Sequence, residues 1–63
     1  MTAAPTAEEL LRRALTIEEE AYGPQDPKLI TTLENYAAVL HELRRLEDAD
    51  AVYARAKSLR AEL

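Results

Sequence analysis

Two apolar stripes that face opposite sides constrain this 63-residue chain more than any other feature of its sequence. The first stripe has the four- and three-residue spacing of a helix face and comprises Leu29, Leu33, Tyr36, Leu40 and Leu43. The second comprises Leu46, Ala49, Val52, Tyr53, Ala56, Leu59 and Leu63. On one straight helix, at about 100° per residue, the two stripes would point in opposite directions, so a single molecule could not bury both. We therefore predict a turn within residues 43–46 that reverses the chain and brings the stripes together.

Capping signals predict three helices, over about residues 7–22, 27–43 and 46–62. Thr6 begins a capping box, because its hydroxyl can accept from the amide of Glu9. Gly23 and Pro24 end the first helix, and the Asp26-Pro27 pair suits the start of the second. The first helix carries its own apolar residues at helical spacing, namely Leu10, Leu11, Ala14, Leu15 and Ile17. The three tyrosines, Tyr22, Tyr36 and Tyr53, lie at core spacing and are predicted to be core residues whose hydroxyls reach an edge.

The chain also contains an internal repeat of 42 residues. Shifted by that amount, AEELLRRALTIEEE (7–20) falls on ADAVYARAKSLRAE (49–62), so that Ala14 meets Ala56 and Ile17 meets Leu59. The first and third helices are therefore copies of one element. The order of elements is half a repeat followed by one whole repeat, B-A-B.

These motifs resemble the tetratricopeptide repeat in its kinesin-light-chain-like form, over about residues 7–63. The segments that carry the resemblance are LENYAAVL (33–40), RLEDADAVYARA (45–56) and the loop YGPQDP; the signature Ala, aromatic, Ala falls on Ala49, Tyr53 and Ala56. The resemblance implies an all-α fold: an antiparallel helical hairpin plus one helix, as a single module spanning 1–63. The family usually has Gly between its two helices, whereas this chain has Arg44. Arg is less favourable than Gly at positive φ, which leaves open a fused helix whose third segment swaps between molecules.

The resemblance also implies a partner-binding face on the second helix. That face would present Thr31, Glu34, Asn35, Ala38, His41 and Glu42. Asn35 matches the family's Asn that holds the backbone of a bound peptide, a role that suits an amide because it both donates and accepts. The alternatives are a solvated Asn35 and a surface His41 near a helix end.

Composition excludes several other functions. The net charge of −4 argues against nucleic acid as a partner, because phosphate binding needs a basic face. With no Cys and one His there is no plausible zinc site, and no catalytic set, phosphate loop or cofactor motif is present. No apolar run is long enough to span a membrane, and the N-terminus lacks signal-peptide features, so we expect a cytoplasmic non-enzyme.

Self-association is the function that the sequence favours. Repeat proteins bury their core by stacking, and about three repeats are normally needed, whereas this chain has one and a half. Residues 1–26 carry a net charge of −4 and residues 43–63 a net charge of +1, so unlike ends can meet. A closed homodimer is expected ahead of a head-to-tail stack, because closed symmetry is far commoner. The alternative is a small inhibitor or accessory subunit that docks on a larger protein, including a larger repeat protein.

Overall fold

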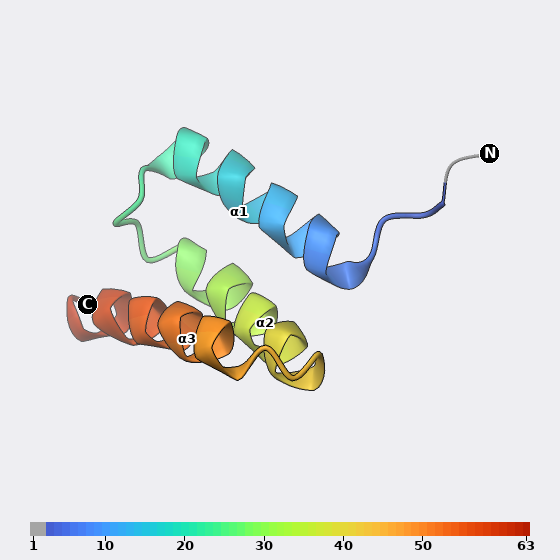
Figure 1. Ribbon diagram of the computed structural model, residues 1–63. Coiled ribbons are helices and arrows are strands. Elements are labelled where there is room, and N and C mark those ends of the chain that lie inside the picture. The colour runs from blue at the N-terminus through green and yellow to red at the C-terminus, as the bar shows by residue number, and fades with distance from the viewer. Residues whose placement is uncertain (1–2) are drawn as a thin grey trace.

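The computed structural model describes residues 3–63, which form three helices, α1 (Ala7–Tyr22), α2 (Leu29–Glu42) and α3 (Leu46–Ala61). The central helix α2 packs on both of its neighbours, and more extensively on α3 than on α1 (Figure 1). Within the described residues there is no strand. The prediction of an all-α fold, a helical hairpin plus one helix, is confirmed.

The N-terminus of α1 is capped as its sequence predicts. The amide of Glu9 donates to the Thr6 hydroxyl over 3.1 Å, and Glu8 and Glu9 place negative charge in the first turn, where the helix dipole favours it. At the other end Gly23 adopts φ +89°, a value that an L-residue rarely takes. A Cβ at Gly23 would meet no atom within 4 Å, so glycine is required here for its backbone conformation alone.

Helix α2 begins at Leu29, two residues after the predicted start. Asp26 does accept a hydrogen bond from the amide of Lys28, over 2.8 Å, as a capping residue should. The amides of Leu29 and Ile30, however, donate to carbonyls three residues back, so a tight turn over residues 26–29 precedes the α-helix.

The chain reverses at residues 43–45, and Arg44 takes the left-handed conformation with φ +64°. The amide of Arg45 donates to Leu40 O over 2.9 Å and the amide of Arg44 to His41 O over 3.0 Å, which is the hydrogen-bond pattern of a Schellman helix end. The stretch from His41 to Asp48 thus contains a tight turn over residues 43–45, with Arg44 at the position where Gly is preferred. Burial of the two opposed apolar stripes against each other stabilises a turn that the local residues do not favour.

The core lies between α2 and its two neighbours. The buried residues are Leu15 from α1; Leu29, Ile30, Leu33, Ala37 and Leu40 from α2; and Ala49, Ala56 and Leu59 from α3. Tyr36 and Val52 pack against this core and are half-buried. Small residues on α3 let its backbone approach α2 closely, as the family signature implies.

Several residues assigned to apolar stripes lie outside this core. The prediction that Tyr22 and Tyr53 are core residues is wrong, because 48% and 45% of each is exposed. Leu43 and Leu63, at the ends of their helices, are 54% and 79% exposed. With α2 covering one side of each neighbouring helix, residues at the edge of a wide stripe have nothing packed against them.

The positive φ of Arg44 generates a stability prediction. Arg44→Gly should raise the free energy of unfolding by about 1 kcal/mol, because glycine adopts this conformation without a Cβ penalty. For a domain of this size the thermal midpoint should rise by about 4–8 °C, measured by circular dichroism. The matched control is Arg44→Ala, which retains the Cβ and should leave the midpoint nearly unchanged. Equal midpoints for the Gly and Ala variants would contradict strain at Arg44.

Candidate interaction surfaces

The predicted partner-binding face is the side of α2 that neither neighbouring helix covers. Tyr36 reaches toward α1 and Glu34 toward α3, and the residues on the remaining side are Thr31, Asn35, Ala38, His41 and Glu42, all exposed. Glu34 differs from the other predicted residues, because it is half-buried and accepts from the Arg60 guanidinium over 2.6 Å. The exposed part of the predicted face therefore centres on Asn35 and Ala38, with Glu34 bonded to Arg60 at its edge.

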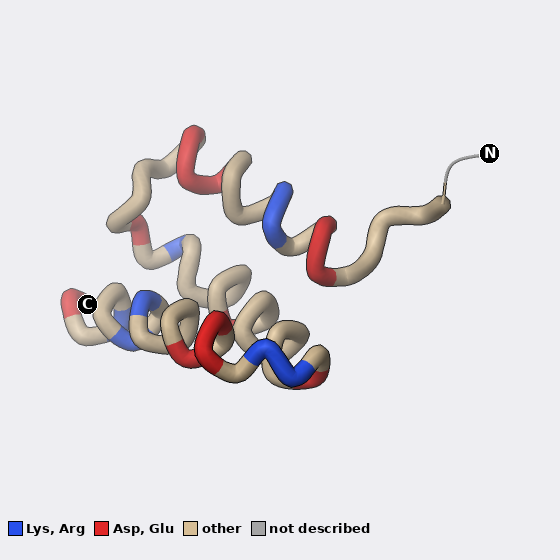
Figure 2. Tube along the Cα trace, viewed as in Figure 1, with Lys and Arg blue, Asp and Glu red and all other residues tan. Residues whose placement is uncertain are grey.

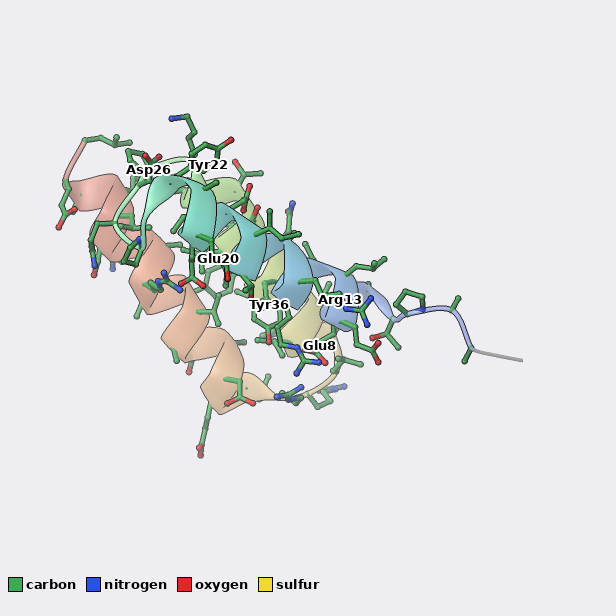
Figure 3. All side chains as sticks on the ribbon, turned by 90° about the horizontal axis from the view of Figure 1, so that it is seen from above. Glu8, Arg13, Glu20, Tyr22, Asp26 and Tyr36 are labelled. Atoms are coloured by element: carbon green, nitrogen blue, oxygen red, sulfur yellow. The ribbon has the colours of Figure 1, made fainter. Side chains whose placement is uncertain are left out.

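A polar cluster around Glu8 joins α1, α2 and the turn between α2 and α3. The Tyr36 hydroxyl donates to Glu8 Oε2 over 3.2 Å, and the side chains of Tyr36 and Glu8 lie close together in Figure 3. Arg12 on α1 lies 3.8 Å from the same carboxylate, and Arg45 from the turn lies 3.6 Å from it. The side chain of Glu8 is only 15% exposed, so these contacts compensate for its partial desolvation. Nothing in the local sequence around Glu8 indicates this cluster, because its partners from α2 and the turn are distant in the sequence.

The same cluster raises the pKa of Tyr36 above its ordinary value of 10.0. Burial of the ring is the largest cause, followed by the hydrogen bond donated to Glu8 and the negative charge of that carboxylate. The guanidinium groups of Arg12 and Arg45 act in the opposite direction and lower the pKa.

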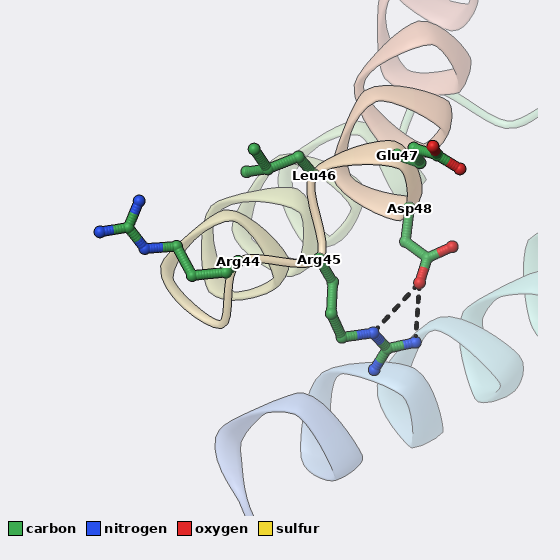
Figure 4. Close-up of a pocket in the computed structure, with 5 residues that line it drawn as sticks. All are labelled: Arg44, Arg45, Leu46, Glu47 and Asp48. Carbon is green, nitrogen blue, oxygen red and sulfur yellow. Dashed lines mark hydrogen bonds and ion pairs between the residues drawn. The ribbon is translucent and has the colours of Figure 1, made fainter.

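The hollow beside the turn is lined by residues 44–48 (Figure 4). Arg45 donates to Asp48 Oδ2, with Nη2 at 2.9 Å and Nε at 3.1 Å, while the Arg44 side chain points away from the helices. The polar groups of Arg45 and Asp48 thus satisfy each other.

An ion pair also joins the two outer helices to each other. Arg55 of α3 bonds to Glu19 of α1, and also donates to the Pro24 carbonyl over 3.2 Å. The side chains are about one-third exposed, so the pair orients the helices more than it stabilises them.

Two further surfaces on the outer helices carry exposed apolar residues and lie outside the predicted partner-binding face. We call the first the outer α1 face; it consists of Leu10, Ala14, Ile17 and Ala21. Leu10 and Ile17 are 52% and 66% exposed. We call the second the outer α3 face; it consists of Leu46, Asp50, Tyr53, Ala54, Lys57 and Ala61. Leu46 is 47% exposed. The width of the apolar stripes on residues 7–22 and 46–62 is the signal that could have revealed both faces, because each stripe is wider than one neighbouring helix can cover.

Charge is distributed unevenly over these surfaces. Acidic residues lie toward both ends of α1, and a basic pair marks the turn before α3 (Figure 2). Within residues 3–63 no group of three or more metal-ligating side chains comes together. No helix in this part of the chain has both the length and the apolar character needed to cross a bilayer.

The helices form a B-A-B arrangement with small residues at their contacts. A protein-family model also matches the sequence that forms them. The model is that of the tetratricopeptide repeat, and it covers residues 4–62. The chain therefore belongs to the tetratricopeptide repeat family, a non-catalytic fold for protein–protein interaction. Its assignment to the kinesin-light-chain-like form stays a prediction. No curated protein and no solved structure matches the chain.

The Tyr36 hydroxyl generates a pH prediction. Because folding raises the pKa of Tyr36, its contribution to stability is complete below pH 10.0 and is lost as the pH rises through the folded-state value. Urea unfolding between about pH 8 and 11 should show this loss in the wild type. Tyr36→Phe should lower stability at about pH 8 by about 0.5–1.5 kcal/mol, because the Glu8 hydrogen bond is removed, and should show a shallower decline at high pH. Parallel declines in the two proteins would contradict the assignment.

Proposed function

We propose that this chain is a non-enzymatic interaction module that associates with itself as a two-fold homodimer through the outer α3 face. A cytoplasmic location stays part of this proposal. The observation that supports self-association is the self-complementary pattern of the outer α3 face. Its residues fall within about 100° of arc on α3, so one helix can contact all of them.

The complementarity appears when two α3 helices run antiparallel about an axis between Tyr53 and Ala54. Tyr53 then lies opposite Ala54 of the second copy, a large side chain over a small one. Leu46 lies opposite Ala61 of the second copy in the same way. Asp50 lies opposite Lys57 of the second copy, so each side of the axis gains one pair of opposite charges.

Burial supports the same surface. Leu46 and Tyr53 are each close to half exposed in the single chain, and both would lose contact with water in this dimer. The alanines at positions 54 and 61 are exposed and allow close approach of a second backbone. A chain this short has a marginal core as a monomer, so it gains much stability from such an association.

Light scattering coupled to size exclusion tests the proposal. The wild type should show about twice the monomer mass of 7.1 kDa at micromolar concentration. Asp50→Lys should raise the dimer dissociation constant about tenfold, because like charges then meet at Lys57 on both sides of the axis. The double variant Asp50→Lys with Lys57→Asp should restore the dimer.

Controls separate this face from other modes of association. Glu20→Lys makes the same change of charge on α1 and should leave the dissociation constant unchanged, because Glu20 lies outside the outer α3 face. A dimer that exchanges α3 would instead lose population in Arg44→Gly, which favours the closed turn. A mass of 7.1 kDa at every concentration contradicts self-association, and a dimer indifferent to Asp50→Lys contradicts this face.

The exposed side of α2 is the second proposed contact, for a peptide or partner domain. Asn35 carries this proposal, because its side-chain amide can both donate to and accept from an extended backbone, and it is exposed among small or polar neighbours. Peptides selected from a library on the folded chain should lose about tenfold or more in affinity to Asn35→Ala, as two hydrogen bonds are lost. Thr16→Ala on α1 is the control and should leave affinity unchanged. Selected peptides that bind both variants equally would contradict the assignment to α2.

A further inference from the structure

The outer α1 face has a covered counterpart inside the same molecule. The 42-residue repeat places Leu10, Ala14 and Ile17 of α1 at the positions of Val52, Ala56 and Leu59 of α3. On α3 these residues pack against α2, and Leu59 is 2% exposed. On α1 the residue equivalent to Leu59 is Ile17, which is 66% exposed. One element thus occurs twice, once with its apolar face covered and once without.

Helix α2 covers the face of α3 that contains Val52, Ala56 and Leu59, but it does not cover the equivalent outer α1 face. It lies against the opposite side of α1, where Leu15 is buried and Glu8 bonds to Tyr36. The outer α1 face is turned away from this contact by about a third of the helix circumference, at about 100° per residue.

We infer that the outer α1 face is a docking site for one helix of the α2 kind, supplied from outside residues 3–63. The covered copy defines the chemistry of that helix. It is amphipathic, with leucines at the spacing of Leu29, Leu33 and Leu40, and it runs antiparallel to α1 as α2 runs antiparallel to α3.

Charge specifies the partner helix further. On α3 the edge of the equivalent contact is marked by Arg60, which bonds to Glu34 of α2 over 2.6 Å. The α1 residue at the position of Arg60 is Glu18, an acid in place of a base. The docked helix should therefore carry Lys or Arg where α2 has Glu34, because a glutamate there would meet the negative charge of Glu18.

Helix α2 of a second copy is not available as the occupant, because its leucines are already buried between α1 and α3 of that copy. Its Glu34 would also meet Glu18. The site therefore takes a helix of different sequence, and the inference is independent of self-association through the outer α3 face. The outer α1 face would thus let the chain act as an accessory subunit, by docking on a protein that supplies an amphipathic helix with a basic residue at this position.

An extended chain tests the site. Residues 24–48 are copied in place of residues 1–6, so that the copied helix precedes α1 as α2 precedes α3, and the copy carries Glu34→Lys. All proteins also carry Asp50→Lys, which keeps association through α3 out of the measurement. The thermal midpoint should rise by about 10 °C over the unextended chain, because Leu10 and Ile17 become buried. The same extension with its glutamate retained should give a smaller rise.

Ile17→Glu shows whether the added helix occupies the proposed face. In the unextended chain this exposed substitution should shift the midpoint by no more than about 3 °C. In the extended chain it should abolish the gain, whereas Thr16→Glu, one residue away and off the face, should not. Equal effects of Ile17→Glu in the two chains overturn the docking site. Equal midpoints for the lysine and glutamate extensions overturn the requirement for a basic residue.

Binding of a separate peptide tests the same site and does not depend on the folding of the extended chain. A peptide of residues 24–45 carrying Glu34→Lys is titrated into the isotope-labelled 63-residue chain. Amide shifts that centre on residues 10–21 and vanish in Ile17→Glu support the site. The absence of shifts, or shifts confined to α2 and α3, overturns it.

Discussion

The packing of α2 on two sides is the constraint on which the rest of the structure depends. Five of its residues are buried, and the outer helices each attach to it and not to one another along their lengths. Two ion pairs also contribute to their relative placement: Arg55 of α3 with Glu19 of α1, and Arg45 of the turn with Glu8 of α1. A change that displaced α2 would therefore move both outer helices at once.

Turning the chain back after α2 requires an unfavourable residue conformation that only long-range packing can offset. Arg44 at φ +64° costs about 1 kcal/mol relative to glycine. Burial of Leu33, Leu40 and Leu59 between the hairpin helices contributes several times that amount, at about 1.5–3 kcal/mol for each fully buried side chain. Burial of these leucines therefore outweighs the strain at Arg44, which is why a stretch without Gly or Pro still forms a tight turn.

Much of the fold could be predicted from the sequence because the relevant signals are local or periodic. The Thr6 cap, the Gly23 helix end and the opposed stripes depend on neighbouring residues or on helical spacing, and the structure contains the expected features. The exposure of Tyr53 and Ile17 does not follow from the direction of their stripes, although the width of those stripes indicates it. Periodicity gives the direction of an apolar face but not the number of helices that cover it. The Glu8 cluster was equally out of reach, since it joins groups from three separate segments.

The modest burial of α1 bears on how the module opens. Within α1, all of which the structure describes, Leu15 is the one buried side chain, whereas α3 buries three residues against α2. The hairpin of α2 and α3 also closes over a shorter stretch of chain and makes the more extensive contact. Local unfolding is expected to follow such differences in buried contact, so α1 should detach as a unit while the hairpin persists. Amide exchange would then be fastest in α1, and each opening would expose the side of Leu29 and Leu33 that Leu15 normally covers, a transient surface distinct from any present in the closed molecule.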